Sequence, residues 1–199
     1  MSDTTEFWKG DFGNQYTARN RVDWRARIPF WDRLVAKYGF RSVYEVGTNS
    51  AWNLSAITHS IHGYNVKCYG CDVNRFAVAQ AKAAGFDVKH GTVDTFNDSE
   101  CVGMQELAFT SGVLIHISPD EIKKMMQAVI DASCDYVLAI EYESDQEEEV
   151  EYRGHAGKLW RRPYGKMYQD MGLELIETGK MDDKDGFDPN GVTYWMLRK

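Results

Sequence analysis

The chain has 199 residues and a formal net charge of −7, with 43% hydrophobic and 27% charged residues. This length suits one folded domain, and the composition is typical of globular proteins. The chain is acidic, and its basic residues are scattered apart from Arg161-Arg162 near Lys158 and Lys166. Proteins that bind duplex nucleic acid usually gather Lys and Arg into a patch, so nucleic acid is disfavoured as a partner.

The first segment of the chain, residues 1–22, is polar and lacks the basic and apolar stretches of a secretory signal. Residues 6–9 and 11–21 predict a short helix and a turn. We hypothesise that the segment 1–22 folds as a lid over the cleft of a single domain spanning 1–199. No apolar run approaches the length of a membrane span, and we expect a cytoplasmic protein.

Helical and strand patterns alternate along the rest of the chain. Apolar residues at helical spacing and terminal glycines predict helices, and short apolar runs predict strands. The predicted helices are 28–38, 51–61, 76–84, 118–130 and 159–171. The predicted strands are 42–46, 66–71, 86–89, 107–110, 136–140, 173–177 and 192–197.

Two of the helices have predicted N-terminal caps. Asn74 is a plausible cap for the helix over 76–84. Ser118 and Glu121 predict a capping box for the helix over 118–130, with Pro119 in the first helical position. The apolar stripe of that second helix is expected to belong to the core.

Alternating strands and helices imply an α/β protein with right-handed crossovers and helices on both faces of a parallel sheet. The last two strands have no helix between them, so we expect a C-terminal hairpin with an antiparallel last strand. A mostly parallel, seven-stranded sheet that ends in this way is the layout of Rossmann-like class I methyltransferases. NAD-binding sheets usually continue with βα units, so an NAD-dependent oxidoreductase is disfavoured.

The turn after the first strand is the first candidate binding site, because ligands of open parallel sheets bind at the carboxyl ends of the strands. Gly47 lets the backbone approach a ligand, and the following helix start offers N–H groups to a carboxylate. S-adenosylmethionine carries a carboxylate, an amine and a sulfonium at its methionine end. Glu45 has the charge to offset the sulfonium.

Two further strand ends face the same cleft. Asp72, followed by Val73, ends the second strand. An acidic residue about 20 residues beyond such a glycine turn commonly accepts hydrogen bonds from ribose hydroxyls. Capping of the next helix is the alternative role of Asp72. Thr92 and Val93, in the segment 91–94, follow the third strand, where an adenine ring would lie.

The fourth strand leads through Ser111 and Gly112 to His116. Imidazole has a suitable pKa for a general base, so His116 is a candidate for that role. A structural histidine that shapes the cofactor pocket is the alternative.

Several blocks of sequence together carry a family resemblance. They are Glu6–Gly13 with Tyr16, Arg19 and Asn20; Glu45–Gly47 with Asn49, Asn53 and Leu54; Gly112–Ile117; Glu141–Tyr142; and Tyr152–His155. On these residues the chain resembles the pseudaminic acid biosynthesis-associated methylases, a branch of the class I methyltransferases. The resemblance implies a Rossmann-like fold, S-adenosylmethionine as cofactor and a sugar-acid context. Ser50-Ala51 departs from the family's apolar residue and Gly, which adds a methyl group at the carboxylate end of the cofactor.

The candidate site residues fall into three groups. Those expected at the cofactor are Tyr16, Arg19, Glu45, Gly47, Asn49, Asn53, Asp72, Val73, Thr92, Val93, Ser111 and Gly112. Those expected at the acceptor are Tyr142, Tyr152 and Arg153. The candidate bases, needed if the acceptor must lose a proton, are His116, Glu141 and His155.

Methyl transfer is an in-line displacement, so the protein must mainly hold the acceptor in line with the methyl group. An aromatic face at Tyr16 suits the sulfonium. Arg19 and Arg153 suit a carboxylate on the acceptor, with an internal salt bridge as the alternative for each. The predicted function is methylation of a small molecule, such as a sugar acid or a nucleotide-linked sugar.

Other functions stay open. One is methylation of another metabolite or of a protein, and another is S-adenosylmethionine binding without catalysis, which Ser50-Ala51 motivates. DNA is disfavoured as an acceptor because the motifs of amino-group and carbon-5 DNA methyltransferases are absent from the sequence. No metal site is predicted. Cys68-x-x-Cys71 has no second cysteine or histidine pair, so buried thiols are favoured over a metal or redox pair.

Overall fold

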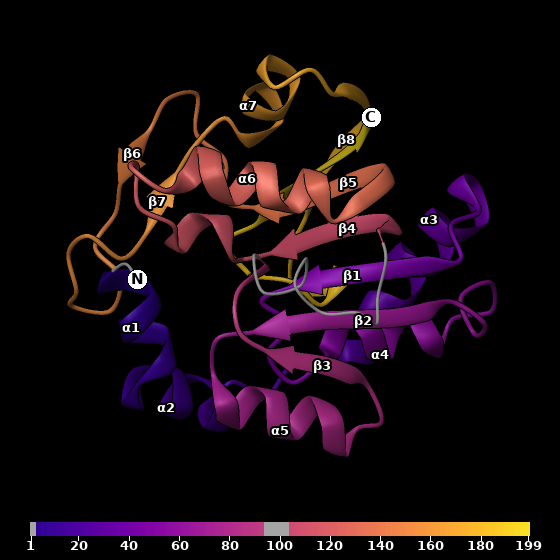
Figure 1. Ribbon diagram of the computed structural model, residues 1–199, viewed down its shortest axis with the longest axis horizontal. Coiled ribbons are helices and arrows are strands. Elements are labelled where there is room, and N and C mark those ends of the chain that lie inside the picture. The colour runs from indigo at the N-terminus through magenta and orange to yellow at the C-terminus, as the bar shows by residue number, and fades with distance from the viewer. Residues whose placement is uncertain (1–2, 94–103) are drawn as a thin grey trace.

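A seven-stranded sheet forms the centre of the structure, a computed structural model that describes residues 3–93 and 104–199 (Figure 1). The strand order is β3-β2-β1-β4-β5-β9-β8. Its strands are β1 (Ser42–Val46), β2 (Lys67–Asp72), β3 (Asp87–His90), β4 (Gln105–Ser111), β5 (Ser133–Glu141), β8 (Glu174–Met181) and β9 (Val192–Arg198). A separate short pair consists of β6 (Glu148–Glu149) and β7 (Trp160–Arg161).

The direction of the strands confirms the predicted fold. Strands β1 to β5 pair in parallel, whereas β9 runs antiparallel to both β5 and β8. A chain that returns without a crossover helix can only pair antiparallel with the strand it has just left. The protein therefore has the Rossmann-like sheet with a C-terminal hairpin that the element order predicts.

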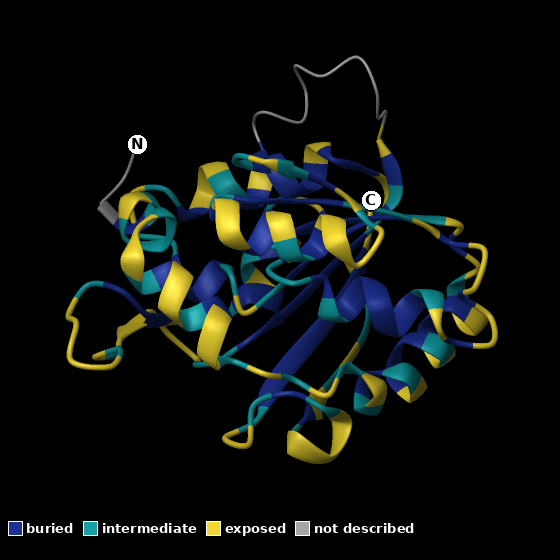
Figure 2. Ribbon diagram, turned by 90° about the horizontal axis from the view of Figure 1, so that it is seen from below, coloured by how far each residue is buried: buried dark blue, intermediate teal, exposed yellow. Residues whose placement is uncertain are grey.

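Helices cover both faces of this sheet. They are α1 (Asp3–Lys9), α2 (Asp11–Arg19), α3 (Ile28–Tyr38), α4 (Trp52–Thr58), α5 (Arg75–Ala83), α6 (Ile122–Asp131) and α7 (Tyr164–Asp170), with short 3-10 turns η1 (Trp24–Arg27), η3 (Leu114–His116) and η4 (Asp183–Asp185). Side chains of α3, α4 and α5 share one core, and those of α6 and α7 share another. Figure 2 shows the buried sheet between helices whose outer surfaces are exposed.

Local sequence signals fix several helix ends. Gly39 ends α3 in the left-handed conformation, with φ 70°. The Asn74 side chain accepts a hydrogen bond from the backbone N–H of Ala77, at 3.0 Å, and so caps α5. Both ends agree with the sequence prediction. None of the helices in the described ranges combines the length and the apolar character needed to cross a bilayer.

The predicted start of α6 is wrong. The helix begins at Ile122 rather than at Ser118, and its first turn has no side-chain cap. The Ser118 hydroxyl contacts the carboxylate of Glu121, at 3.5 Å, instead of a backbone N–H group. Residues 119–121 therefore form a turn that precedes the helix.

The predicted start of α7 and the predicted end of α4 are also wrong. Helix α7 begins at Tyr164 because Pro163 disfavours the helical conformation in the residue before it. Trp160–Arg161 instead pairs with Glu148–Glu149 as a strand. Helix α4 ends at Thr58, short of the predicted residue 61.

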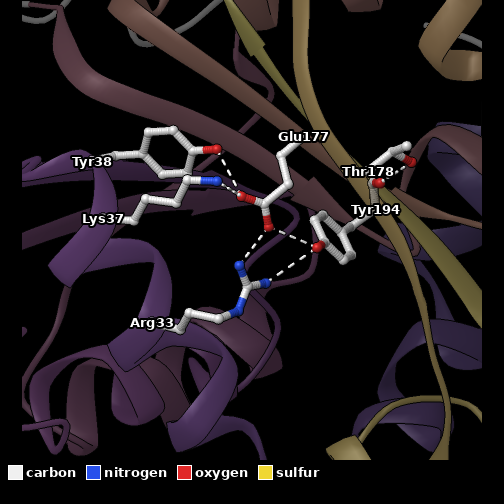
Figure 3. Close-up of polar contacts among 6 residues, drawn as sticks. All are labelled: Arg33, Lys37, Tyr38, Glu177, Thr178 and Tyr194. Carbon is white, nitrogen blue, oxygen red and sulfur yellow. Dashed lines mark hydrogen bonds and ion pairs between the residues drawn. The ribbon is translucent and has the colours of Figure 1, made fainter.

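A carboxylate on β8 ties the C-terminal hairpin to α3 (Figure 3). Glu177 accepts hydrogen bonds from Lys37 Nζ at 2.6 Å, Tyr38 Oη at 2.8 Å and Tyr194 Oη at 2.7 Å, and it pairs with Arg33. Partial burial opposes ionisation of Glu177, but these donors, Lys37 foremost, outweigh it and lower the pKa of the carboxyl to about 2. The ionised carboxylate is therefore part of the native structure.

The Glu177→Gln variant is expected to lose about 2 kcal/mol of unfolding free energy at pH 7, because four partners lose a charged acceptor. A carboxyl whose pKa is lowered by folding stabilises the protein above its unfolded value of 4.5 and stops doing so as pH falls to about 2. The difference between wild type and variant should therefore shrink over this range in urea titrations. Glu174→Gln, on the same strand and largely exposed, is the control and should change stability little.

Candidate functional site

A cleft lies at the carboxyl ends of β1, β2, β3 and β4, beneath the two N-terminal helices. Figure 1 shows α1 and α2 on the side to which the arrowheads of β1 and β2 point. Ten predicted site residues line the cleft: Tyr16, Gly47, Asn49, Asp72, Val73, Thr92, Val93, Ser111, Gly112 and His116. Asp94, in the predicted adenine segment, lies outside the described residues.

Asp72 braces the glycine turn at the floor of the cleft. One carboxylate oxygen accepts the N–H of Asn49 and the other accepts the N–H of Asn74, each at 2.8 Å. Burial raises the pKa of Asp72, while these two donors favour its charged form. Each carboxylate oxygen has a second lone pair, so Asp72 is able to accept hydrogen bonds from a ligand as well. It does not itself cap α5, since Asn74 does.

Gly47 allows two strand ends to approach closely. Its φ is 72°, and a Cβ built there would lie 2.4 Å from Cγ2 of Val113. The turns after β1 and β4 therefore meet at Gly47, as the predicted site requires. A larger residue would separate them.

Ala51 holds its methyl group away from the cleft. The residue is left-handed, with φ 62°, which explains why glycine is favoured in this position. Its side chain is fully buried in the core with Leu54 and does not line the cleft. The methyl group that the sequence places next to the cofactor thus packs into the protein interior.

The Ala51→Gly variant is accordingly expected to bind S-adenosylhomocysteine within about threefold of the wild-type affinity, which is below 1 kcal/mol. The relief of left-handed strain and the loss of one buried methyl group nearly cancel in stability. Calorimetric titration of both proteins checks this. A tenfold gain in affinity for the variant would show that the methyl group does obstruct the cofactor.

Glu45 and Asn53 lie behind the glycine turn, not in the cleft. Asn53 Nδ2 donates to Glu45 Oε1 at 2.7 Å, and Arg27 Nη1 donates to Asn53 Oδ1 at 2.8 Å. Burial raises the pKa of Glu45 to about 8, against the Asn53 donor and the nearby charge of Arg27. In this position Glu45 supports the turn from behind.

His116 is held in one tautomer on the wall of the cleft. Its Nδ1 lies 2.6 Å from the carbonyl oxygen of Lys158, which only accepts, so Nδ1 carries the proton. Burial lowers the pKa of His116 to about 4, so the ring is neutral near pH 7. The lone pair is therefore on Nε2.

Glu141 holds the turn that carries His116. Its buried carboxylate accepts the N–H groups of Val113 and Leu114 at 3.1 Å and of Ile115 at 3.4 Å. Burial raises the pKa of Glu141 to about 7 against these donors. The carboxylate thus faces the backbone of η3, an arrangement that suits a positioning role rather than that of a base.

The N-terminal helices place an aromatic cluster over the cleft. Trp8 is at its centre, with ring centroids 5.2 Å from Tyr16, 4.6 Å from His116 and 6.2 Å from Tyr152. Asn74 Nδ2 donates to the Trp8 carbonyl at 3.0 Å, which ties α1 to the start of α5. Helices α1 and α2 therefore lie over the cleft.

The remaining predicted residues surround the cleft without lining it. Tyr152 and His155 close a tight turn by mutual backbone hydrogen bonds of 2.9 and 3.0 Å, with Arg153 at φ 51°. The His155 ring lies 5.0 Å from that of Phe7, and the Tyr142 hydroxyl donates to Asp188 at 2.6 Å.

The two candidate arginines lie beside aromatic rings. The Arg19 guanidinium lies 5.3 Å from the Phe12 ring, and that of Arg153 lies 5.7 Å from the Tyr152 ring. Neither forms an ion pair with another residue in ranges 3–93 and 104–199. The alternative role as an internal salt bridge therefore finds no partner there.

Several lining residues escaped the sequence analysis. Cys71, Asn74 and Met125 lie outside every predicted site segment. The others belong to a predicted segment without being named as site residues: Thr4, Thr5, Trp8, Gly13 and Thr17 to the lid, Val46 to the glycine turn, Gly91 to the adenine segment, and Val113 and Ile117 to the block after the fourth strand. Met125 belongs to the stripe of α6 that was assigned to the core. Periodicity identifies the inward face of a helix but does not show where the core gives way to a cleft.

The two neighbouring cysteines are on opposite faces of β2. Residues three apart in a strand point to opposite sides, and Cys68 and Cys71 accordingly pack into different cores. Both thiols are free, and burial raises the pKa of each to about 12. Among the residues that the structure describes, no group of three or more metal-ligating side chains is present.

Comparison with known proteins identifies the fold. No protein-family model matches the chain, and no curated protein matches its sequence. A 1,6-didemethyltoxoflavin-N1-methyltransferase from Burkholderia thailandensis, solved with bound 1,6-didemethyltoxoflavin and S-adenosylhomocysteine, superposes with a TM-score of 0.73 at 15% identity, covering 100% of this chain and 91% of that one.

Two more solved structures share the arrangement. A magnesium protoporphyrin IX methyltransferase from Synechocystis, with bound S-adenosylhomocysteine, gives a TM-score of 0.68 at 10% identity and covers 98% of this chain and 97% of that one. A sugar N-methyltransferase from Streptoalloteichus gives 0.64 at 14% identity, covering 96% and 94%. The chain therefore has the Rossmann-like fold of class I methyltransferases.

Proposed function

We propose that this protein is an S-adenosylmethionine-dependent methyltransferase that acts on a small molecule. The observation that carries the proposal is the carboxylate of Asp72 at the cleft floor, braced by the Asn49 turn and facing a space closed by aromatic residues of α1 and α2. The carboxylate suits the two hydroxyls of a ribose. The space beside it suits an apolar base, and the aromatic residues suit a cationic sulfonium.

The lining residues fit the cofactor. Asp72 would accept hydrogen bonds from the ribose hydroxyls, and Val73, Val93 and Met125 would contact the adenine ring. The turn through Gly47 and Asn49 would hold the methionine end. When bound, S-adenosylmethionine supplies an activated methyl group on a cationic sulfur.

Aromatic faces favour that cation and exclude water around it. Trp8 and Tyr16 line the cleft from α1 and α2, and both present ring surface rather than charge. The segment 1–22 would act as a lid that closes after the cofactor has entered. A closed site holds the acceptor in line with the methyl group, which is the main requirement of the reaction.

We further propose a sugar acid or a nucleotide-linked sugar as the acceptor. The resemblance to pseudaminic acid biosynthesis-associated methylases supports this class of acceptor. Arg19 and Arg153, next to the cleft and without ion-pair partners in the described ranges, are suited to a carboxylate or a phosphate. Tyr142 and Tyr152 would complete that side of the site.

Calorimetric titration with S-adenosylmethionine and S-adenosylhomocysteine tests the cofactor, with NAD as the control. Micromolar binding of the first two alone is expected. Transfer of a labelled methyl group to acidic and nucleotide-linked sugars then tests the acceptor class. A folded protein that binds neither sulfur compound would refute the proposed function.

A further inference from the structure

Trp8 and His116 face one another on the cleft wall, one from the N-terminal helices and one from the turn after β4. Their ring centroids are 4.6 Å apart, and the planes are inclined by 54°. Both residues line the cleft. A ligand group in that part of the cleft would therefore contact both rings.

The two rings offer opposite hydrogen-bonding groups. His116 Nδ1 donates to the Lys158 carbonyl, which leaves Nε2 as an acceptor with no partner of its own in the described ranges. Trp8 Nε1 is a donor, and it is buried with no acceptor among the residues that the structure describes. A buried N–H group without a partner is unfavourable, so an oxygen atom from a bound ligand would stabilise this arrangement.

We propose that the methyl acceptor is a hydroxyl group bound between Trp8 Nε1 and His116 Nε2, and that the product is a methyl ether. This inference rests on the proposed methyltransferase function and names the atom that is methylated. A hydroxyl oxygen accepts from Trp8 with one lone pair and attacks the methyl carbon with the other. Its proton is donated to His116.

Other acceptor groups do not match this pair. A neutral amine has one lone pair, which must attack, so Trp8 Nε1 would stay without an acceptor. A carboxylate has no proton to donate to His116, so a lone pair of its oxygen would face the lone pair of Nε2. Of these three groups, the hydroxyl alone satisfies both rings.

The bonds and charges balance in this step. The C–O bond forms as the sulfur–methyl bond breaks, and the electron pair of that bond stays on sulfur to give neutral S-adenosylhomocysteine. The hydroxyl proton moves to Nε2 of His116, which becomes an imidazolium and later releases the proton to water. Because the oxygen becomes strongly acidic as it is methylated, a weakly basic imidazole is sufficient.

The test uses S-adenosylmethionine labelled with carbon-13 in its methyl group, incubated with the protein and the acidic and nucleotide-linked sugars proposed as acceptors. The chemical shift of the transferred methyl carbon separates O-methyl from N-, S- and C-methyl products. An O-methyl ether is expected. A methyl group on nitrogen, sulfur, carbon or a carboxylate would overturn the inference, as would no transfer by a protein that still binds S-adenosylhomocysteine. Loss of that binding would instead count against the proposed function itself.

Two variants then test the roles of the rings on the identified acceptor. Trp8→Phe removes the N–H donor and keeps the aromatic face, and it should lower kcat about 10-fold to 100-fold with unchanged affinity for S-adenosylhomocysteine. His116→Ala should lower kcat by at least about 100-fold. Added imidazole should partly restore the activity of His116→Ala, which a purely structural role would not allow.

Matched controls come from residues outside the cleft. Trp24→Phe and His59→Ala remove the same groups at a partly exposed and an exposed position, and neither should change kcat or respond to imidazole. Full turnover by folded Trp8→Phe or by folded His116→Ala would overturn the inference. If either variant fails to fold, the chemical shift of the product methyl group still decides the acceptor atom.

Discussion

The Asp72→Ala variant is expected to bind S-adenosylhomocysteine about 100-fold more weakly than the wild type, a change of about 2.7 kcal/mol. Each hydrogen bond from a ribose hydroxyl to a carboxylate contributes about 1.5–3 kcal/mol. The variant also removes the acceptor for the N–H groups of Asn49 and Asn74, which lie 2.8 Å from the carboxylate. Both losses act on cofactor binding, which calorimetry measures directly.

The matched control for this prediction is Asp120→Ala, an exposed acidic residue in the turn before α6. It should leave the affinity unchanged. Asp72→Asn keeps the size and one oxygen acceptor, so it should give an intermediate loss. An Asp72→Ala protein that folds and binds within threefold of the wild type would remove Asp72 from the cofactor site.

The Glu141→Ala variant is expected to lose about 3 kcal/mol of unfolding free energy and to turn over about 100-fold more slowly. The N–H groups of Val113, Leu114 and Ile115 at the start of η3 lose their acceptor, and leaving buried donors unpaired is costly. The same turn carries His116, and a displacement of about 1 Å at a reacting group can cost 10²-fold in rate. Urea unfolding and steady-state kinetics measure the two effects separately.

Glu141→Gln should be intermediate in both measurements. It keeps one oxygen acceptor but places an NH₂ group near backbone donors. The exposed neighbour Glu143 provides the control, and Glu143→Ala should change neither quantity by more than a small amount. Wild-type kinetics from Glu141→Ala would mean that the position of His116 does not depend on this carboxylate.

The local sequence was sufficient for the sheet and for most element ends. Periodicity located all seven strands of the main sheet, and the missing helix between the last two strands gave the antiparallel hairpin. Gly39 and Asn74 act through their own backbone conformation or a contact three residues away, so short-range patterns identify them. The capping box at Ser118 failed because its hydroxyl found the Glu121 side chain instead of a backbone N–H group.

In the candidate site, too, the sequence placed some residues correctly and others not. Ligands bind at the carboxyl ends of parallel strands, and Gly47, Asp72 and Gly112 each lie at such an end. This rule therefore placed all three on the cleft. The same rule also placed Glu45 on the cleft. Side chains alternate between the two faces of a strand, however, and the Glu45 side chain points toward α4 and η1.

The sequence by itself determined the Rossmann-like fold and the edge of the sheet at which chemistry is expected, because both depend on patterns within one element or between consecutive ones. Only the tertiary structure decided what individual side chains do there. Trp8 meets His116, Glu141 reaches back to η3, and the methyl group of Ala51 turns into the core. These contacts join segments far apart in the chain, and their partners are selected by packing and burial rather than by local pattern.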